Sequence, residues 1–499
     1  MAVTPTFFLC FFLFVAFVSL SSAQVQQKLM LPLSHSLSKT KFTSTHHLLK
    51  STTIKSTARH HHHRTRHSNK LKNHHRHHQH QQQISLPLSP GTDYTLTFSI
   101  NSQTLSVYMD TGSDIVWFPC SPFECILCEG KFEPGTLTPL NVSKSSLISC
   151  KSRACSTAHN SPSTSDLCAI AKCPLDEIET SDCSNYHCPS FYYAYGDGSL
   201  IAKLHKHNLI MPSTSNKPFS LKDFTFGCAH SALGEPIGVA GFGFGSLSLP
   251  AQLANLSPDL GNQFSYCLVS HSFDSTKLHH PSPLILGKVK ERDFDEITQF
   301  VYTPMLDNPK HPYFYSVSME AISVGSSRVR APNALIRIDR DGNGGVVVDS
   351  GTTYTMLPTG FYNSVATELD RRVGRVFKRA SETESKTGLS PCYYLEGNGV
   401  ERLGLVVPRL AFHFGGNYSV VLPRRNYFYE FLDGEDEKKG RKVGCLMLMD
   451  GGDESEGGPG ATLGNYQQQG FQVVYDLEER RVGFAPRKCA SLWESLTQG

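Results

Sequence analysis

Two short segments of the chain place an aspartate between an apolar run and a turn rich in glycine and hydroxyl groups. They are Asp110 with Thr111, Gly112 and Ser113, and Asp349 with Ser350, Gly351 and Thr352. The surrounding sequences are SVYMDTGSDIVWFP (106–119) and GVVVDSGTTYTMLP (345–358). One such turn arises easily by chance. Two in the same context, 239 residues apart, indicate two lobes of similar size that each present one loop.

Two carboxylates that meet in one site have coupled proton affinities. Because like charges a few ångströms apart cannot both ionise cheaply, one pKa falls and the other rises from about 3.9, and the pair holds one proton. The ionised carboxylate can take a proton from water while the neutral one polarises an amide carbonyl. The pattern therefore predicts peptide-bond hydrolysis by a water activated between Asp110 and Asp349, with no cofactor and no metal.

Short apolar or alternating runs separated by polar turn residues dominate the body of the chain. Examples are YTLTFSI (94–100), GVVVD (345–349) and FQVVYD (471–476), and the clearest helical patterns lie at 249–256 and 361–373. This patterning predicts a mostly β protein. About 415 residues of body are enough for two or more domains. They contain no apolar run of the roughly 18 residues that a membrane-spanning helix needs.

Further motifs accompany the first aspartate. Trp117 follows it by seven residues in VYMDTGSDIVW, and YGDGS occupies 195–199. With these motifs the chain, from about residue 90 to 490, resembles the pepsin-like aspartic protease family. The resemblance implies a bilobal fold, with two β-barrel-like lobes and a cleft between them, and Asp110 and Asp349 as the catalytic pair.

The resemblance also assigns roles to the neighbouring residues. The hydroxyl and glycine residues of the two loops would support the catalytic pair. The flap would consist of Tyr195, Gly196, Asp197 and Gly198. Tyr195 would close over the substrate and hydrogen-bond toward Trp117. Apolar-apolar-Gly elements would follow the loops at 239–241 and 462–464.

Within the family the chain looks like the plant nepenthesin-type branch. The signs are a Cys-dense insert after Trp117, FGC (226–228), FSYC (264–267) and GNYQQQGFQVVYD (464–476). The implied organisation is an N-terminal lobe at 84–290 with the insert at 120–188, and a C-terminal lobe at 291–499. The implied activity is that of a monomeric endopeptidase acting on polypeptides at acidic pH. The alternative is a non-catalytic relative that binds proteins or polysaccharides, such as a xylanase inhibitor.

The chain has 15 cysteines. Cys10 lies in an N-terminal apolar run that is expected to be removed as a signal peptide, so 14 remain. An even number in a secreted chain predicts disulfides. The branch resemblance implies the pairs Cys120–Cys125, Cys128–Cys228, Cys150–Cys188, Cys155–Cys183, Cys267–Cys489 and Cys392–Cys445. Cys168 and Cys173 are extra to that pattern and would pair with each other. A zinc site at Cys125 and Cys128 is the competing interpretation, but the later cysteine pairs lack finger spacing.

The N-terminus has the features of a secretory signal. The run FFLCFFLFVAFV (7–18) is of signal-peptide length, and small residues follow it, which predicts a signal peptide at 1–23. We therefore expect a protein secreted to the extracellular space or cell wall, with the vacuole or a plastid as alternatives. Sequons at Asn141, Asn255 and Asn417 predict N-glycosylation.

Charge is divided unevenly along the chain. The total is 47 Lys plus Arg against 44 Asp plus Glu, yet residues 24–83 hold 11 Lys or Arg and no acid. The remainder, 84–499, has a formal charge of −8. This division suggests a detachable segment and does not indicate a nucleic-acid or membrane partner. In the pepsin-like family a basic pro-segment can lie across the acidic cleft of a zymogen, so the resemblance implies that residues 24–83 are such a pro-segment or a linker. A plain linker and a His-rich metal site are the alternatives for a segment whose low-complexity part should be disordered when alone.

The effect of pH on such docking follows from the same charges. Carboxylates lose their charge in acid, which weakens the attraction between the head and the body. Protonation of the 13 histidines in residues 24–83 would make the head still more basic. Counting charges therefore assigns release of the pro-segment to the carboxylates and not to the histidines.

Overall fold

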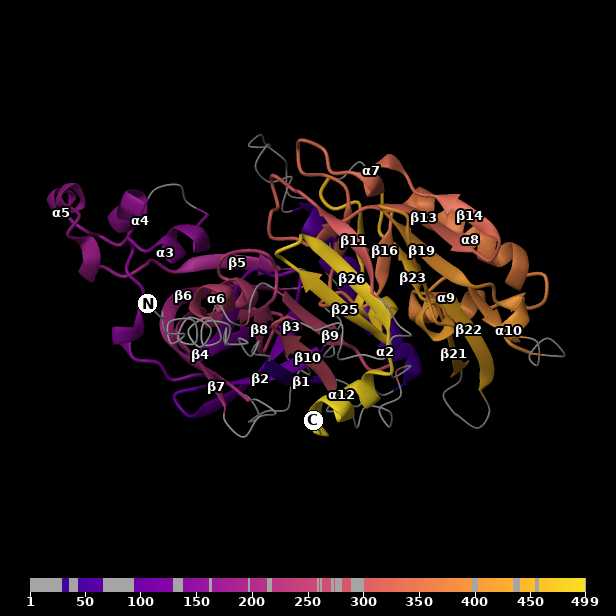
Figure 1. The fold of residues 1–499 in the computed structure, drawn as a ribbon, viewed down its shortest axis with the longest axis horizontal. Helices are drawn as coiled ribbons and strands as arrows, with labels where there is room; N and C mark the ends of the chain where they lie inside the picture. Colours follow the sequence, from indigo (N-terminus) through magenta and orange to yellow (C-terminus); the bar gives the residue numbers. More distant parts are fainter. Residues whose placement is uncertain are drawn as a thin grey trace, which may run out of the picture.

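The computed structural model describes two stretches of the basic head and most of the body. The described residues are 29–35, 44–65, 94–128, 138–160, 164–195, 198–212, 218–257, 260, 263–270, 273, 281–288, 300–396, 403–433, 440–453 and 457–498. Two lobes lie side by side, the N-terminal one in magenta and the C-terminal one in orange (Figure 1). The predicted bilobal, mostly β fold is confirmed. The predicted signal peptide lies outside the described residues.

The N-terminal lobe places a short strand between two longer ones. Its strands are β2 (Tyr94–Ile100), β3 (Gln103–Asp110), β4 (Val116–Ile126), β5 (Phe191–Tyr195), β6 (Gly198–Met211), β7 (Phe219–Leu233) and β8 (Gly238–Gly241). β2 and β3 form an antiparallel hairpin, while β8 runs parallel to β3 and antiparallel to β4. Because β8 lies between β3 and β4, it supports the loop that connects them, and that loop begins at Asp110.

The C-terminal lobe repeats this arrangement. The relevant elements are β15 (Val346–Val348), β16 (Thr355–Leu357), β23 (Leu448–Asp450), β24 (Ala461–Leu463) and the helix α8 (Thr359–Val373). β24 runs parallel to β15 and contacts β16 in the antiparallel sense, as β8 does with β3 and β4. The helix predicted at 361–373 is α8. It buries Phe361, Val365 and Leu369, which recur every four residues along one face.

A sheet in the middle of the molecule joins the two lobes. Its order is β1 (Leu29–His35), β10 (Ser282–Leu286), β9 (Gln263–Cys267), β25 (Phe471–Asp476), β26 (Arg481–Pro486) and β11 (Val301–Leu306), each strand antiparallel to the next. The outermost strand, β1, comes from the basic head, and its last two residues also pair with β2. Part of the head is therefore a member of the central sheet.

The second described stretch of the head is the helix α2 (Thr45–Thr65). Its sequence has no apolar stripe, and polar contacts with the body account for much of its burial. Thr52 Oγ1 lies 2.8 Å from Tyr354 Oη, and the Tyr354 N–H donates to Ser56 Oγ at 3.2 Å. The disorder expected of the isolated segment thus gives way to a helix where it contacts the body. No helix in the described part of the chain is long and apolar enough to cross a bilayer.

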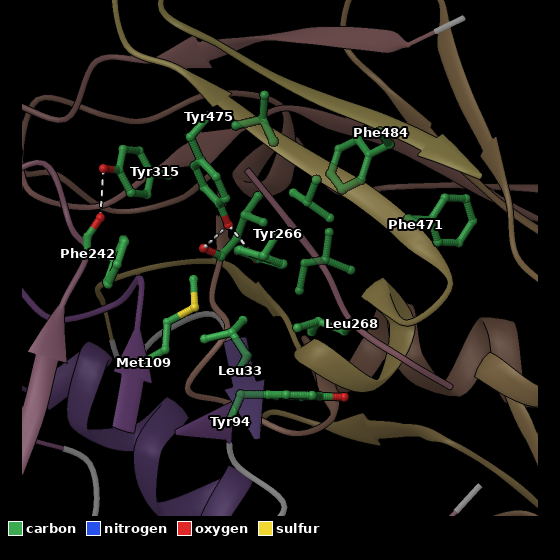
Figure 2. Close-up of a cluster of buried hydrophobic side chains, with 14 of the residues drawn as sticks. Leu33, Tyr94, Met109, Phe242, Tyr266, Leu268, Tyr315, Phe471, Tyr475 and Phe484 are labelled. Atoms are coloured by element: carbon green, nitrogen blue, oxygen red, sulfur yellow. Dashed lines mark hydrogen bonds between the residues drawn. The ribbon is translucent and has the colours of Figure 1, made fainter. Parts of the chain in front are cut away.

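Buried aromatic residues fill the region beneath the two aspartate loops. Figure 2 shows Tyr266, Tyr315 and Tyr475 there, with Leu33 of β1 beside Tyr94. The hydroxyls of Tyr266 and Tyr475 lie 2.9 Å apart, and Tyr475 Oη donates to the Val348 carbonyl at 3.4 Å. Val348 ends β15, directly before Asp349. This packing therefore supports the strand that carries the second aspartate.

All fourteen cysteines from Cys120 onward are paired, but five of the seven expected pairings are wrong. The pairs are Cys120–Cys228, Cys125–Cys128, Cys150–Cys168, Cys155–Cys188, Cys173–Cys183, Cys267–Cys489 and Cys392–Cys445. The expected Cys120–Cys125, Cys128–Cys228, Cys150–Cys188, Cys155–Cys183 and Cys168–Cys173 are absent. The register explains the first correction, since β4 runs parallel to β7 and Phe118 pairs with Cys228, which places Cys120 beside it. Within the insert, three short helices fold over one another and bring other cysteines together.

Candidate active site

The two aspartates end equivalent strands and face one site. Asp110 is the last residue of β3, paired with Gly241 of β8, and the Asp349 N–H donates to the Leu463 carbonyl of β24 at 3.1 Å. These partners belong to the apolar-apolar-Gly elements at 239–241 and 462–464. Both carboxylates are buried, with residue exposures of 2% for Asp110 and 0% for Asp349. The fold therefore takes both charges out of water.

Each carboxylate accepts the same pair of hydrogen bonds from its own loop. Oδ1 of Asp110 accepts from the Gly112 N–H at 2.9 Å, and its Oδ2 accepts from the Ser113 hydroxyl. In the second loop the Gly351 N–H donates to Asp349 Oδ1 at 2.9 Å, and the Thr352 hydroxyl donates to Oδ2 at 2.5 Å. These four donors fix both carboxylate planes.

The loops are also tied to each other by Thr111 and Ser350. The Thr111 N–H donates to Ser350 Oγ at 3.1 Å, and the Ser350 N–H donates to Thr111 Oγ1 at 2.8 Å. Each hydroxyl then donates across the site to a backbone carbonyl, Thr111 to Val348 at 3.1 Å and Ser350 to Met109 at 3.3 Å. All four groups are buried and satisfied, so the tie is rigid.

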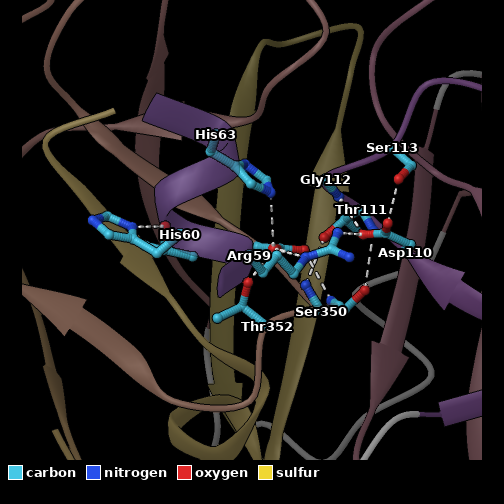
Figure 3. Close-up of polar contacts among 12 residues, drawn as sticks. Arg59, His60, His63, Asp110, Thr111, Gly112, Ser113, Ser350 and Thr352 are labelled. Carbon is cyan, nitrogen blue, oxygen red and sulfur yellow. Dashed lines mark hydrogen bonds and ion pairs between the residues drawn. The ribbon is translucent and has the colours of Figure 1, made fainter. Parts of the chain in front are cut away.

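Arg59 of α2 occupies the space between the two carboxylates (Figure 3). Its Nε donates to Asp349 Oδ2 at 2.9 Å, and its Nη2 donates to Asp110 Oδ1. Only 7% of the Arg59 side chain is exposed. One guanidinium thus bridges both aspartates in the fork geometry that suits carboxylates.

The charges of this ion pair reinforce each other. Burial would raise the pKa of Asp349, but the Arg59 charge and the hydrogen bonds from Thr352 and Gly351 outweigh it and hold that pKa below its usual range. Burial opposes the charge of Arg59 too, yet Asp110 and Asp349 keep the pKa of the guanidinium well above its ordinary value. Arg59 and Asp349 are therefore both charged when α2 is docked.

The predicted flap is a hairpin of β5 and β6, in which Tyr195 pairs with Gly198. Gly196, Asp197 and the side chain of Tyr195 lie outside the described residues, so the predicted bond between Tyr195 and Trp117 stays a prediction. Trp117 itself is buried in the core of the N-terminal lobe. The hairpin is tied to the first loop by Tyr193, whose hydroxyl donates to Asp114 Oδ1 at 2.7 Å.

Sequence reasoning missed three polar residues of this site. Arg59 was counted in the charge of the head, but nothing in a low-complexity run distinguishes it from its neighbours. Tyr193 and Asp114 carried a usable signal. Residues two apart on a strand share a face, so Tyr193 should face the same way as Tyr195, and Asp114 directly follows the first loop.

A group of possible metal ligands, Cys155, His159 and Cys188, lies in the Cys-rich insert away from the two aspartates. Its two sulfurs are joined in a disulfide. A disulfide offers no thiolate, and thiolates are the sulfur ligands that zinc requires. The group therefore does not revive the zinc interpretation.

Comparisons with known proteins agree with this geometry. The family described as "Xylanase inhibitor N-terminal" matches residues 94–288, and "Xylanase inhibitor C-terminal" matches residues 314–486. A probable aspartyl protease of Arabidopsis thaliana is 57% identical over 98% of this chain and 99% of its own length. The aspartic proteinase nepenthesin-2 of Nepenthes gracilis is 29% identical over 82% of this chain and 81% of its own.

A solved structure supports the fold alone. Conglutin gamma, described as a unique basic 7S globulin from lupine seeds, superposes with a TM-score of 0.55 at 19% identity, over 81% of this chain and 93% of that one. Fold likeness at this identity says nothing about catalysis. The family follows from the match at 57% identity and from the two family regions. The chain belongs to the plant pepsin-like aspartic proteases, in the nepenthesin-type branch.

Proposed function

We propose that the chain is a secreted aspartic endopeptidase, which hydrolyses peptide bonds in acid and is synthesised in a latent form. The observation that carries this proposal is the equivalence of the two loops. Each presents a buried carboxylate with an N–H on Oδ1 and a hydroxyl on Oδ2. A binding protein would not require two identical sets of donors on facing acids, whereas a catalytic pair does.

The reaction follows from the pair sharing one proton. The ionised carboxylate takes a proton from a water molecule as the water oxygen attacks the peptide carbonyl, and the protonated carboxyl donates to the carbonyl oxygen. The tetrahedral intermediate then collapses. The C–N bond breaks, a proton passes to the leaving amine, and the pair returns to one proton. The glycine N–H and hydroxyl donors hold each carboxylate in place throughout.

Latency in this proposal comes from α2. With Arg59 on both carboxylates, neither is available to a water or a substrate carbonyl. Arg64, at the end of the same helix, donates to the carbonyls of Gly451 and Gly457 at 2.9 and 3.2 Å. The N-terminal half is held by Thr52 and Ser56 against Tyr354. The helix is thus fixed on both sides of the blocking residue.

The test is hydrolysis of a denatured protein at about pH 3–5, with and without pepstatin, by wild type, Asp110→Asn and Asp349→Asn. The proposal expects each single change to reduce the rate by roughly a thousandfold or more, because one neutral amide leaves no acid–base pair. Asp223→Asn is the matched control, since this carboxylate is exposed and distant from the loops. Cleavage by the Asp110→Asn variant at the wild-type rate would refute the proposed protease activity.

The competing function is binding without catalysis, in the manner that the name xylanase inhibitor suggests for the matched family. Both catalytic loops are intact here, which favours the enzyme. The same assay separates the two functions. A purified, processed chain that binds a protein or polysaccharide target but cleaves nothing would support the alternative.

Secretion rests on different observations. The fourteen paired cysteines suit an oxidising compartment, and the three sequon asparagines, Asn141, Asn255 and Asn417, are exposed. Mass analysis of the protein from the extracellular fluid of plant tissue would test both glycosylation and location. Recovery only from vacuoles or plastids would overturn the extracellular part of the proposal.

A further inference from the structure

We propose that His60 and His63 form a pH-sensitive latch, buried between α2 and the body, whose protonation in mild acid drives α2 out of the cleft. The inference rests on the latency proposed above, but it concerns the helix and can be tested without catalysis. The observations that carry it are the positions of the two rings. Each ring is enclosed by the body and lies near an arginine of its own helix. A second positive charge on the ring would therefore be poorly compensated.

His60 lies against the C-terminal lobe. The residue is fully buried, and its Nδ1 is 2.9 Å from Thr462 Oγ1, in the strand that supports Asp349. The opposite edge of the ring lies so close to Gly451 that a side-chain carbon there would be 2.8 Å from Nε2. The charged groups that act on it are Arg64 and His61 of its own helix, together with the polar backbone of Gly451. A proton on His60 would therefore sit beside a cation.

His63 lies one turn further along α2, over the active site. It is 3% exposed and stacks on Phe314 with ring centroids 4.9 Å apart. Its Nε2 is 3.9 Å from Asp349 Oδ2, which is beyond hydrogen-bond distance, and its buried Nδ1 has no hydrogen-bond partner among the described residues. Asp349 already accepts from Arg59.

The charges around His63 come from both sides of the interface. Asp110 and Asp349 face it from the catalytic loops, and Arg59, His60 and His62 lie on its own helix. Arg59 lies closer to both acids than His63 does, and burial together with the Arg59 charge outweighs the attraction of Asp110 for a proton on His63. The same pair of carboxylates cannot satisfy a guanidinium and an imidazolium together.

Burial is the main cause of the resulting shifts. It lowers the pKa of His60 from 6.5 to about 3, with Arg64 and His61 adding to the effect. It also lowers the pKa of His63 well below 6.5, and Arg59 contributes further. Docked α2 therefore binds fewer protons than free α2. Its stability is complete above pH 6.5 and declines as the pH falls toward 3, by roughly three hundredfold in the docking constant at pH 4 for His60 alone.

The carboxylates add to the effect at lower pH. Docking holds the pKa of Asp349 below its usual value of 3.8, whereas the released pair can share a proton, so acid favours release there too. The histidines contribute from a higher pH, because their ordinary pKa is 6.5. The charge count assigns release to the carboxylates, and the latch proposed here adds these two histidines. Their protons enter a buried interface that already holds two arginines.

The measurement is hydrogen exchange of the α2 amides in the full-length chain. Labelling pulses run from about pH 7.5 to 3.5, short enough that mass analysis finds the chain intact, and rates are corrected for intrinsic exchange. The opening constant of wild-type α2 should rise with falling pH, with a slope that approaches two protons per molecule between about pH 5.5 and 4.5. A slope near zero above about pH 4 would overturn the latch, whether or not the protein is a protease.

Matched variants identify the groups. His60→Asn keeps a polar group near the Nδ1 position, and His63→Gln keeps one near Nε2, but neither takes up a proton. In the double variant the opening midpoint should fall by at least one pH unit, while His61→Gln, on the partly exposed side of the same helix, should leave it unchanged. An unchanged midpoint in the double variant would refute the assignment. If α2 of the double variant is already open at neutral pH, the single variants give the test. Each should reduce the slope of the opening constant against pH by about one proton relative to wild type, and an undiminished slope would also refute the assignment.

Discussion

Gly351 lies so close to the opposite aspartate loop that a side-chain carbon on it would stand 2.5 Å from Asp110 Oδ1. The relation is nearly symmetric, since a carbon on Gly112 would stand 2.9 Å from Asp349 Oδ1. Real carbon atoms do not approach oxygen so closely. The glycines are therefore required by the distance between the loops. Neither has the left-handed backbone that usually explains a glycine.

Gly351→Ala should abolish most activity without unfolding the protein. The methyl group must push Asp110 away, and a displacement near 1 Å is enough to cost about a hundredfold in rate. The check is the rate of peptide hydrolysis by the processed chain, with circular dichroism to verify the fold. Gly360→Ala is the matched control, because a carbon at that position of α8 meets no atom within 4 Å. It should keep full activity and gain a little stability. Equal activity of the two variants would contradict this account of the loops.

Ser350→Ala should weaken both stability and catalysis. It leaves the Thr111 N–H buried without its acceptor, which costs about 1–3 kcal/mol, and it frees one loop to move relative to the other. Urea unfolding gives the first effect, and kcat the second. Ser350→Thr keeps the hydroxyl and should restore both. Equal stability and kcat in the Ser350→Ala and Ser350→Thr variants would show that the hydrogen bonds between the two loops contribute little.

Arg59→Ala should remove latency at neutral pH. The change leaves two buried carboxylates without their cation, and breaking such a pair typically costs about 3–5 kcal/mol, here at the expense of docked α2. Binding of labelled pepstatin to the unprocessed chain measures the opened cleft directly. Lys50→Ala removes the same charge from an exposed position on α2 and should leave the site closed. If both variants stay closed, Arg59 is not the blocking residue.

Two disulfides should differ sharply in what they contribute to stability. Cys267–Cys489 closes 222 residues and Cys125–Cys128 only 3. If restriction of the unfolded chain dominates, replacing the first pair by serines should cost about 5 kcal/mol and the second about 1–2 kcal/mol. Guanidinium unfolding of the two double variants provides the comparison. Similar losses would mean that local packing, and not loop closure, sets the contribution.

The two aspartates of the site were predictable because their signal is repeated. Asp110 and Asp349 stand in matching sequences, each at the end of an apolar strand, and the structure brings them together as expected. The same periodicity revealed the strands on which they lie. Motifs and periodicity depend only on neighbouring residues, so a single sequence is enough to detect them.

Other features depend on which distant segments meet. Cys120 pairs with Cys228 because two strands run parallel in one register, and spacing along the chain does not encode that. Arg59 is similar, since several arginines of the head could have satisfied the charge count. The burial of His60 and His63 likewise depends on the tertiary structure, and a count of histidines does not reveal it. Their burial, and not their number, determines how they respond to pH.

The basic head consists of two parts that differ in how they attach to the body, because β1 belongs to the central sheet and α2 does not. Three of its leucines, Leu29, Leu31 and Leu33, are buried in the main core, and its backbone pairs with β10 from Leu29 to Leu33. A single cut between α2 and β2 would free the helix but leave this strand seated, so the processed protein would be two chains held without a covalent bond. Recombinant protein begun after residue 83 would instead present the open edge of β10, and open edges invite pairing between molecules. For production of soluble protein, residues 29–35 are best regarded as part of the folded body.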